Sequence, residues 1–136
     1  MIASLGAVAA LAMNAAFTAF SCSDIIGVVF DDENRNGIHD RGERGLPGIA
    51  IATVHGVWVV TDRLGRFVLP CAVVPGRFGS SYILKVDTRT LPQGYELTTR
   101  NPAWLRASQG RVHQVRFGAA RTAPAVGRLL DPSARR

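Results

Sequence analysis

With 136 residues the chain has room for one domain. Its net charge is +6, and Lys85 is the only lysine among 16 basic residues, so arginine carries nearly all of the positive charge. The arginines are spread thinly, without a recognition-helix pattern, a zinc-ligand spacing or an aromatic-basic stripe, which argues against nucleic-acid binding. A basic tail that rests on an anionic membrane or polysaccharide stays open as an alternative. Its arginines are Arg121, Arg128, Arg135 and Arg136.

The chain begins with an apolar, Ala-rich run from Met1 to Phe20 that contains no charged residue. This run is typical of a secretory signal, with Ala19-Phe20-Ser21 before a possible cleavage point, although the usual positive start is missing. About 20 apolar residues could also span a bilayer once. We therefore expect residues 1–21 to be an export signal or an N-terminal apolar anchor, which would be the only membrane contact if it is not cleaved.

Two cysteines follow, Cys22 and Cys71. In an exported protein two cysteines favour one disulfide, which would close a loop of about 50 residues and contribute roughly 3–4 kcal/mol in the chain-entropy description. Two alternatives are a lipid-modified Cys22, for which the preceding residues fit the usual lipobox poorly, and a Cys71 that is simply a buried apolar residue.

The stretch from Asp32 to Glu43 reads DENRNGIHDRGE and matches the calcium-loop pattern D-x-[DN]-x-[DN]-G-x5-E. Side-chain oxygens recur at alternate positions, Gly37 permits a sharp turn, and calcium prefers six to eight oxygen ligands in flexible geometry. Arg35, Arg41 and Arg44 occupy non-ligand positions and can point outward. The predicted ligands of Ca²⁺ are Asp32, Asn34, Asn36, Ile38 through its carbonyl, Asp40 and Glu43.

The segments beside this loop argue against an EF-hand. Residues 25–30 before the loop are rich in β-branched residues, and Gly45-Leu46-Pro47-Gly48 after it would break a helix. The loop is therefore expected to join two β-strands, where calcium would hold the loop together. The alternative is a polar surface turn without a metal.

Short β-branched and aromatic segments then alternate with turn signals along the chain. No segment after Asp24 has a sustained helical period, which predicts an all-β, antiparallel β-sandwich of about seven strands, Ig-like or prealbumin-like, with the calcium loop after the first strand. The expected strands are 25–30, 49–54, 57–61, 66–69, 82–87, 95–99, 104–106 and 112–117. The sandwich is expected over residues 22–118, followed by a flexible Arg-, Pro- and Ala-rich tail over residues 119–136. The expected core is Val28, Phe30, Ile49, Ile51, Val57, Val59, Phe67, Leu69, Ile83, Val86, Tyr95, Leu97, Val115 and Phe117.

Several of these segments together resemble SdrD B-like domains, relatives of the Cna B-type, prealbumin-like sandwiches of bacterial surface proteins. The similarity covers roughly residues 25–118 and begins with Gly27-Val28-Val29-Phe30-Asp31-Asp32, Asn34-Arg35-Asn36-Gly37, Asp40, Gly42-Glu43 and Gly45-Leu46-Pro47-Gly48. It continues with Thr61-Asp62, Gly65-Arg66-Phe67 and Leu91-Pro92-Gln93-Gly94-Tyr95. The resemblance implies an extracellular sandwich that binds calcium in its first inter-strand loop and serves as a spacer or stalk module. By matching positions in the loop, the resemblance implies the same six calcium ligands.

The chain departs from that family in two respects. It holds one copy without internal repeats, and Lys85 lies in a middle strand, whereas the lysine of the family's isopeptide crosslink lies in the first. The apolar N-terminal run, the cysteine pair and the Arg-rich composition favour the envelope of a Gram-negative organism, in an extracellular, cell-surface or periplasmic location.

The three histidines, His39, His55 and His113, are widely separated, and neither a nucleophile-elbow motif nor a metal-binding histidine pair accompanies them. We expect no enzymatic activity. The sequence therefore predicts an exported, calcium-binding structural, stalk or adhesion module, with an extracellular protein or glycan as its partner. The alternatives are a carbohydrate- or ligand-binding domain that uses Trp58, Trp104 and the 70–80 connection, and an accessory domain of an exported hydrolase.

Overall fold

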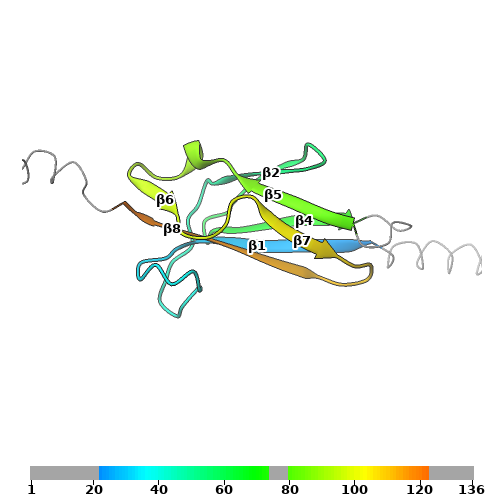
Figure 1. The fold of residues 1–136 in the computed structure, drawn as a ribbon, viewed down its shortest axis with the longest axis horizontal. Coiled ribbons are helices and arrows are strands. Elements are labelled where there is room, and N and C mark those ends of the chain that lie inside the picture. Colours follow the sequence, from blue (N-terminus) through cyan, green and yellow to red (C-terminus); the bar gives the residue numbers. More distant parts are fainter. Residues whose placement is uncertain (1–21, 74–79, 123–136) are drawn as a thin grey trace, which may run out of the picture.

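The computed structural model describes residues 22–73 and 80–122, in which the chain folds as two packed sheets of four strands (Figure 1). Sheet A has the strand order β4-β1-β8-β6 and sheet B the order β3-β2-β5-β7. The elements are β1 (Ser23–Asp31), β2 (Ala50–Thr53), β3 (Trp58–Val60), β4 (Arg66–Val73), β5 (Ser80–Val86), the 3-10 turn η1 (Thr88–Thr90), β6 (Tyr95–Leu97), β7 (Ala103–Ala107) and β8 (His113–Arg121). The predicted all-β sandwich is confirmed.

Three sequence segments lie outside the described residues. They are the expected export signal or anchor (1–21), residues 74–79 of the 70–80 connection, and residues 123–136 of the expected tail. Within residues 22–73 and 80–122, no helix is long and apolar enough to cross a membrane.

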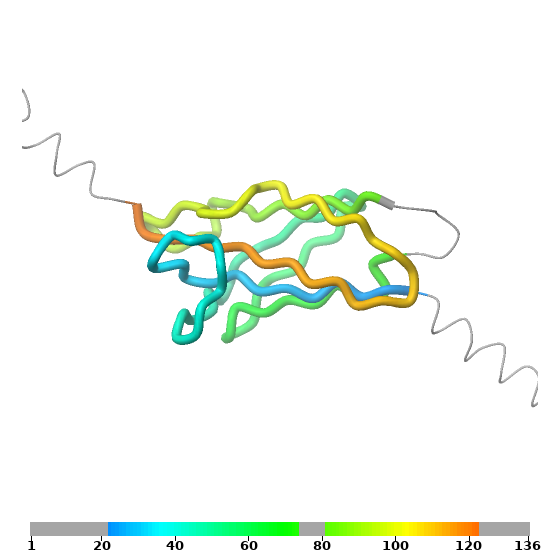
Figure 2. The backbone as a smooth tube through the Cα atoms, turned by 60° about the horizontal axis from the view of Figure 1, so that its bottom comes forward, coloured from blue at the N-terminus to red at the C-terminus, as the bar shows by residue number. Residues whose placement is uncertain are grey.

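Strands β1 and β8 lie side by side in the middle of sheet A and run parallel, from Ile25 opposite His113 to Asp31 opposite Ala119. The other strand pairs are antiparallel, as predicted. The expectation of a wholly antiparallel sandwich is wrong for β1 and β8. Hydrophobic alternation predicts which face of the sheet a side chain occupies, but it does not predict the direction of the strand. As a consequence, β1 begins at one pole of the sandwich and β8 ends at the other (Figure 2).

The last strand is longer than the sequence pattern indicates. It continues to Arg121, three residues beyond the expected limit of the sandwich at residue 118. Ala119 lies opposite both Asp31 of β1 and Leu97 of β6, and it is fully buried. The small side chain of Ala119 fits between two neighbouring strands. The sequence did not predict a strand here, because alanine is depleted in strands.

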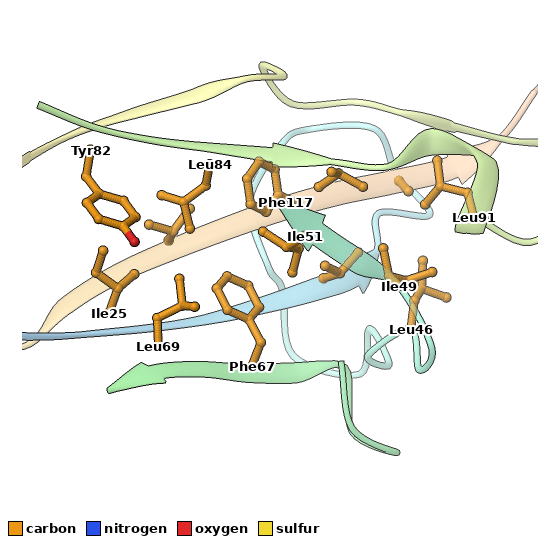
Figure 3. Packing of buried hydrophobic residues seen from close by; sticks show 14 of the residues in the cluster. Ile25, Leu46, Ile49, Ile51, Phe67, Leu69, Tyr82, Leu84, Leu91 and Phe117 are labelled. Atoms are coloured by element: carbon orange, nitrogen blue, oxygen red, sulfur yellow. The ribbon is translucent and has the colours of Figure 1, made fainter. Parts of the chain in front are cut away.

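The core lies between the two sheets (Figure 3). The predicted core residues Ile49, Ile51, Phe67, Leu69, Val86, Val115 and Phe117 are buried in it. Val59, Tyr95 and Leu97 pack against it in partly buried positions.

Four predicted core residues are placed differently, and one of them, Phe30, is buried outside the cluster between the sheets. Val28 and Ile83 are only partly buried, because the adjacent Val29 and Leu84 point inward instead. Val57 is 48% exposed, since it belongs to the turn before β3. The errors at Val28, Phe30 and Ile83 are shifts of register by one residue, which place a side chain on the opposite face of its strand.

The predicted disulfide between Cys22 and Cys71 is present, with a Cα–Cα distance of 5.0 Å. It connects the start of β1 to β4 at a bulge, where Ser23 faces Val73 while Ile25 faces Leu69. The Cys71 backbone has φ +53°, and its N–H donates to the Asp24 carboxylate at 2.8 Å. Because both sulfurs are used in this bond, the alternatives of a lipid-modified Cys22 and a simply buried Cys71 do not apply to this structure.

Candidate metal centre

The predicted calcium loop, residues 32–43, follows β1 directly and lies at the pole where β8 also ends (Figure 2). The His39 ring stacks on the Phe30 ring, with 4.7 Å between their centroids. Phe30 is fully buried but does not belong to the cluster between the sheets, and it forms an isolated bridge with Gly45. The loop therefore folds back along β1 and covers the side chain that β1 presents on its outer face.

Asp32 is the anchor of the loop. Its side chain is fully buried, and its carboxylate accepts hydrogen bonds from the backbone N–H groups of Asn36 (3.1 Å) and Gly37 (2.9 Å). The same carboxylate accepts a hydrogen bond from the Thr98 hydroxyl at 2.5 Å, and the Asp32 N–H donates to the carbonyl of Ala119 at 2.8 Å. A buried carboxylate needs such donors, and these connect the loop to β8 and to the segment after β6.

Two further predicted ligands, Asn34 and Asn36, meet at a third, Asp40. The amide groups of Asn34 and Asn36 donate to one oxygen of the Asp40 carboxylate, at 2.8 and 2.7 Å. These donors, Asn34 first, hold the pKa of Asp40 below its ordinary value because they favour the charged carboxylate. The amide oxygens of Asn34 and Asn36 accept backbone N–H groups two residues further on, at 3.3 and 2.9 Å, which is the hydrogen bonding of an Asx-turn.

Glu43 closes the loop onto Asp40. The Asp40 N–H donates to the Glu43 carboxylate at 2.9 Å, and the Glu43 N–H donates to the Asp40 carbonyl at 3.2 Å. Gly37 has φ +74°, so the turn at the middle of the loop uses the conformation that glycine adopts freely. Ile38 is 62% exposed, and because its hydrocarbon side chain offers no ligand atom, only its backbone carbonyl could bind a cation.

The donor chemistry of this loop suits Ca²⁺, because the predicted ligands offer carboxylate, amide and carbonyl oxygens and neither sulfur nor imidazole. The conformation is nevertheless closed by hydrogen bonds among the ligands themselves. Among the residues that the structure describes, no three His, Cys, Asp or Glu side chains form a group that could hold a metal. Calcium binding therefore stays a prediction, in which Ca²⁺ would replace the amide-to-carboxylate hydrogen bonds.

Two arginines of this segment, Arg35 and Arg44, contact groups outside the predicted ligand set. The Arg35 guanidinium pairs with Glu96 of β6 at 2.9 Å and also donates to the carbonyl of Arg121 at the end of β8. The nearest nitrogen of Arg44 lies 3.8 Å from the buried Asp31 carboxylate, which accepts a hydrogen bond from the Tyr95 hydroxyl at 3.0 Å. The loop is thus attached to the rest of sheet A by charged groups as well as by Asp32.

Two residues that sequence reasoning missed hold this arrangement together, Thr98 and Gly118. A Cβ at Gly118 would lie 2.6 Å from the Thr98 hydroxyl, 3.0 Å from the Phe30 ring and 3.2 Å from the Asp32 side chain. A glycine inside a strand often marks such a close approach, but the expected strand ended at residue 117, so Gly118 was not placed within it. Thr98 had no signal in the sequence, because one hydroxyl after a short strand is unremarkable.

The three histidines lie in separate parts of the fold. His39 covers Phe30, His55 lies beside the Tyr82 ring with 5.3 Å between centroids, and His113 hydrogen-bonds to the backbone of Ser108. Each contact accounts for its histidine as a structural residue.

The sequence matches no protein-family model and no curated protein sequence. Among solved structures, the fold is similar to the crystal structure of GBS52, the minor pilin of the Gram-positive pathogen Streptococcus agalactiae, with a TM-score of 0.55 and 11% sequence identity. The match covers 77% of this chain and 47% of the pilin, so the chain spans about half of that protein. At this identity the likeness concerns the fold, which agrees with the class of sandwich that the sequence predicts for bacterial surface proteins.

The anchoring role of Asp32 leads to a prediction about stability. In the presence of a chelator, Asp32→Ala should lower the free energy of unfolding by at least about 3 kcal/mol, because two backbone N–H groups and the Thr98 hydroxyl lose their acceptor. Thr98→Val should cost about 1.5–3 kcal/mol, the range for one hydrogen bond to a charged group. Urea unfolding measures both changes, and Glu33→Ala at an exposed loop position is the control. An Asp32→Ala protein as stable as the control would contradict this role.

Proposed function

We propose that the chain is a structural module of an exported bacterial surface protein, a stalk or adhesion unit of the SdrD B-like type. The observation that carries this proposal is the parallel pairing of β1 with β8. The chain enters sheet A at Ser23 at one pole and leaves it at Arg121 at the other (Figures 1 and 2). Modules joined through such ends extend in one direction, which suits a spacer between a surface and a ligand.

The same pairing suits a module under tension. A pull on the two ends acts along β1 and β8 in opposite directions, so the hydrogen bonds along their register share the load. If β1 and β8 were instead pulled apart from the same end, these hydrogen bonds would break one after another. Force that enters at Cys22 also reaches β4 through the disulfide, which spreads the load over a third strand of sheet A.

Two further observations support an exported location. Disulfides such as Cys22–Cys71 persist in oxidising compartments outside the cytosol. The fold is also similar to about half of a minor pilin of a Gram-positive bacterium. We propose a cell-surface or extracellular location on these grounds, and a non-enzymatic role because the histidines serve as structural contacts.

We further propose that Ca²⁺ binds the loop through Asp32, Asn34, Asn36, the Ile38 carbonyl, Asp40 and Glu43. Bound Ca²⁺ supplies positive charge that screens the repulsion among the loop carboxylates. Asp32 would transmit this stabilisation to sheet A, because it is bonded to Thr98 and to Ala119. Calcium would then strengthen the pole at which β8 ends.

The stalk function can be tested by single-molecule pulling. Tethers at the two ends of the full chain load β1 against β8 lengthwise and should give a high unfolding force. A tether at the N-terminus and one inserted at Gly110, in the turn before β8, pull from the same pole and should separate the pair at a clearly lower force. Equal forces in the two geometries would contradict the load-bearing role of this pair.

Calcium binding can be tested by thermal unfolding. With a dissociation constant of about 0.1–1 mM, as in extracellular calcium modules, 10 mM Ca²⁺ at about 10–100 times this constant should add about 1.4–2.7 kcal/mol and raise Tm by roughly 5–20 °C over the chelator-treated protein. The Asp40→Asn/Glu43→Gln variant keeps the buried Asp32 and should lose this increase. Mg²⁺ at the same concentration is the control. Identical melting curves with calcium and with chelator would exclude the proposed site.

A further inference from the structure

Both tryptophans of the chain are on the surface of sheet B. Trp58 of β3 is 59% exposed and Trp104 of β7 is 73% exposed, although tryptophan carries one of the largest apolar side chains. They belong to the two edge strands, separated by β2 and β5. Neither side chain contributes to the core, so core packing does not explain why tryptophan occupies these two positions.

The strand register places both side chains on the outer face of the sheet. Trp58 lies opposite Ala52, which lies opposite Lys85, and residues directly opposite each other project to the same side. Two positions earlier on β5, Ile83 lies opposite Trp104. The inward-facing neighbours Leu84 and Val86 are fully buried, which identifies the other side as the outer one.

The charged side chains of this face are cations. In β2, β3, β5 and β7, all of them described, the charged residues are Lys85 and Arg106, and Arg106 lies opposite Ser81 on the same face as Trp104. Both are exposed. The nearby Asp87 is already paired with Arg89 at 2.9 Å. An occupant of this face would therefore meet two indole rings, two cations, and apolar side chains between them such as Ala52 and Ile83.

The separation of the two rings indicates an extended ligand. Three strand spacings and a shift of two residues place Trp58 and Trp104 about 16 Å apart, from the ordinary dimensions of a sheet. A single sugar ring cannot reach both, whereas an oligosaccharide of several units can. The CH faces of pyranose rings pack against aromatic rings, and carboxylate groups of such a chain would pair with Lys85 and Arg106.

We propose that the outer face of sheet B binds an extended acidic polysaccharide, with pyranose rings on Trp58 and Trp104 and uronate carboxylates on Lys85 and Arg106. A second copy of the chain is a poorer occupant, because a two-fold contact would bring the same cations against each other. A single-stranded nucleic acid has similar chemistry, but the disulfide indicates an oxidising compartment, where polysaccharides are the commoner partner.

Because these are the only two tryptophans, intrinsic fluorescence reports directly on the face. Titration of the full chain with a long oligogalacturonate should change this fluorescence, and monomeric galacturonate should bind far more weakly. Trp58→Ala and Trp104→Ala should each weaken binding about fivefold or more, measured by calorimetry, while the Trp→Phe variants should retain part of the affinity. Lys85→Gln/Arg106→Gln should weaken binding and reduce its salt dependence.

The net charge of +6 makes a matched control necessary, since a basic protein attracts any polyanion. Arg63→Gln/Arg116→Gln removes the same charge outside this face and should leave the affinity nearly unchanged. Circular dichroism melts verify that each variant is folded. The proposal is overturned if the two double variants weaken binding equally, or if the oligogalacturonate does not bind at millimolar concentration. It is also overturned if oligo-dT binds more tightly in the same buffer, or if sedimentation shows a dimer that Trp58→Ala dissociates.

Discussion

The parallel pairing of β1 with β8 determines most of what this molecule can do. It brings the first and last described strands together in the middle of sheet A, so β4 and β6 become the edges of that sheet. It also places the entry and the exit of the sandwich at opposite poles. The disulfide reinforces this arrangement from one side, because it joins the start of β1 to β4. A load between the poles is thus carried by the centre of a sheet and not by an edge.

The candidate metal centre depends on the same pairing. Asp32 follows β1 directly, and its contacts with Thr98 and Ala119 exist only because β8 and the segment after β6 lie beside it. Gly118 permits this approach, since a side chain there would collide with Thr98 and Phe30. A loop built in this way has two parts: a buried anchor at Asp32, and an outer part from Asn34 to Glu43 whose hydrogen bonds a cation could replace. The buried anchor contributes to the stability of the fold, and the outer part is the proposed calcium site.

Much of the fold could be predicted from sequence because its signals are local. Alternating β-branched residues indicated the strands, glycine-containing turns separated them, and two cysteines in a chain expected to be exported indicated the bond between Cys22 and Cys71. The direction of β8 could not be predicted, because no local pattern distinguishes a parallel partner from an antiparallel one. Within β5 the inward position was missed by one residue only at Ile83, since Tyr82, Ile83 and Leu84 are all apolar and alternation is therefore absent there. The loop residues were identified by spacing, whereas Thr98 became visible only in three dimensions, 66 residues from Asp32.

The load path and the anchored loop both depend on β8 lying beside β1, parallel to it, in the middle of sheet A. Nuclear magnetic resonance tests this directly through cross-strand contacts and amide exchange. The account predicts nuclear Overhauser effects that link Gly27 with Val115 and Val29 with Phe117 in a parallel pattern, together with slow amide exchange along both strands. Fast exchange along β8, or contacts that pair β1 with β8 in the antiparallel sense, would contradict it.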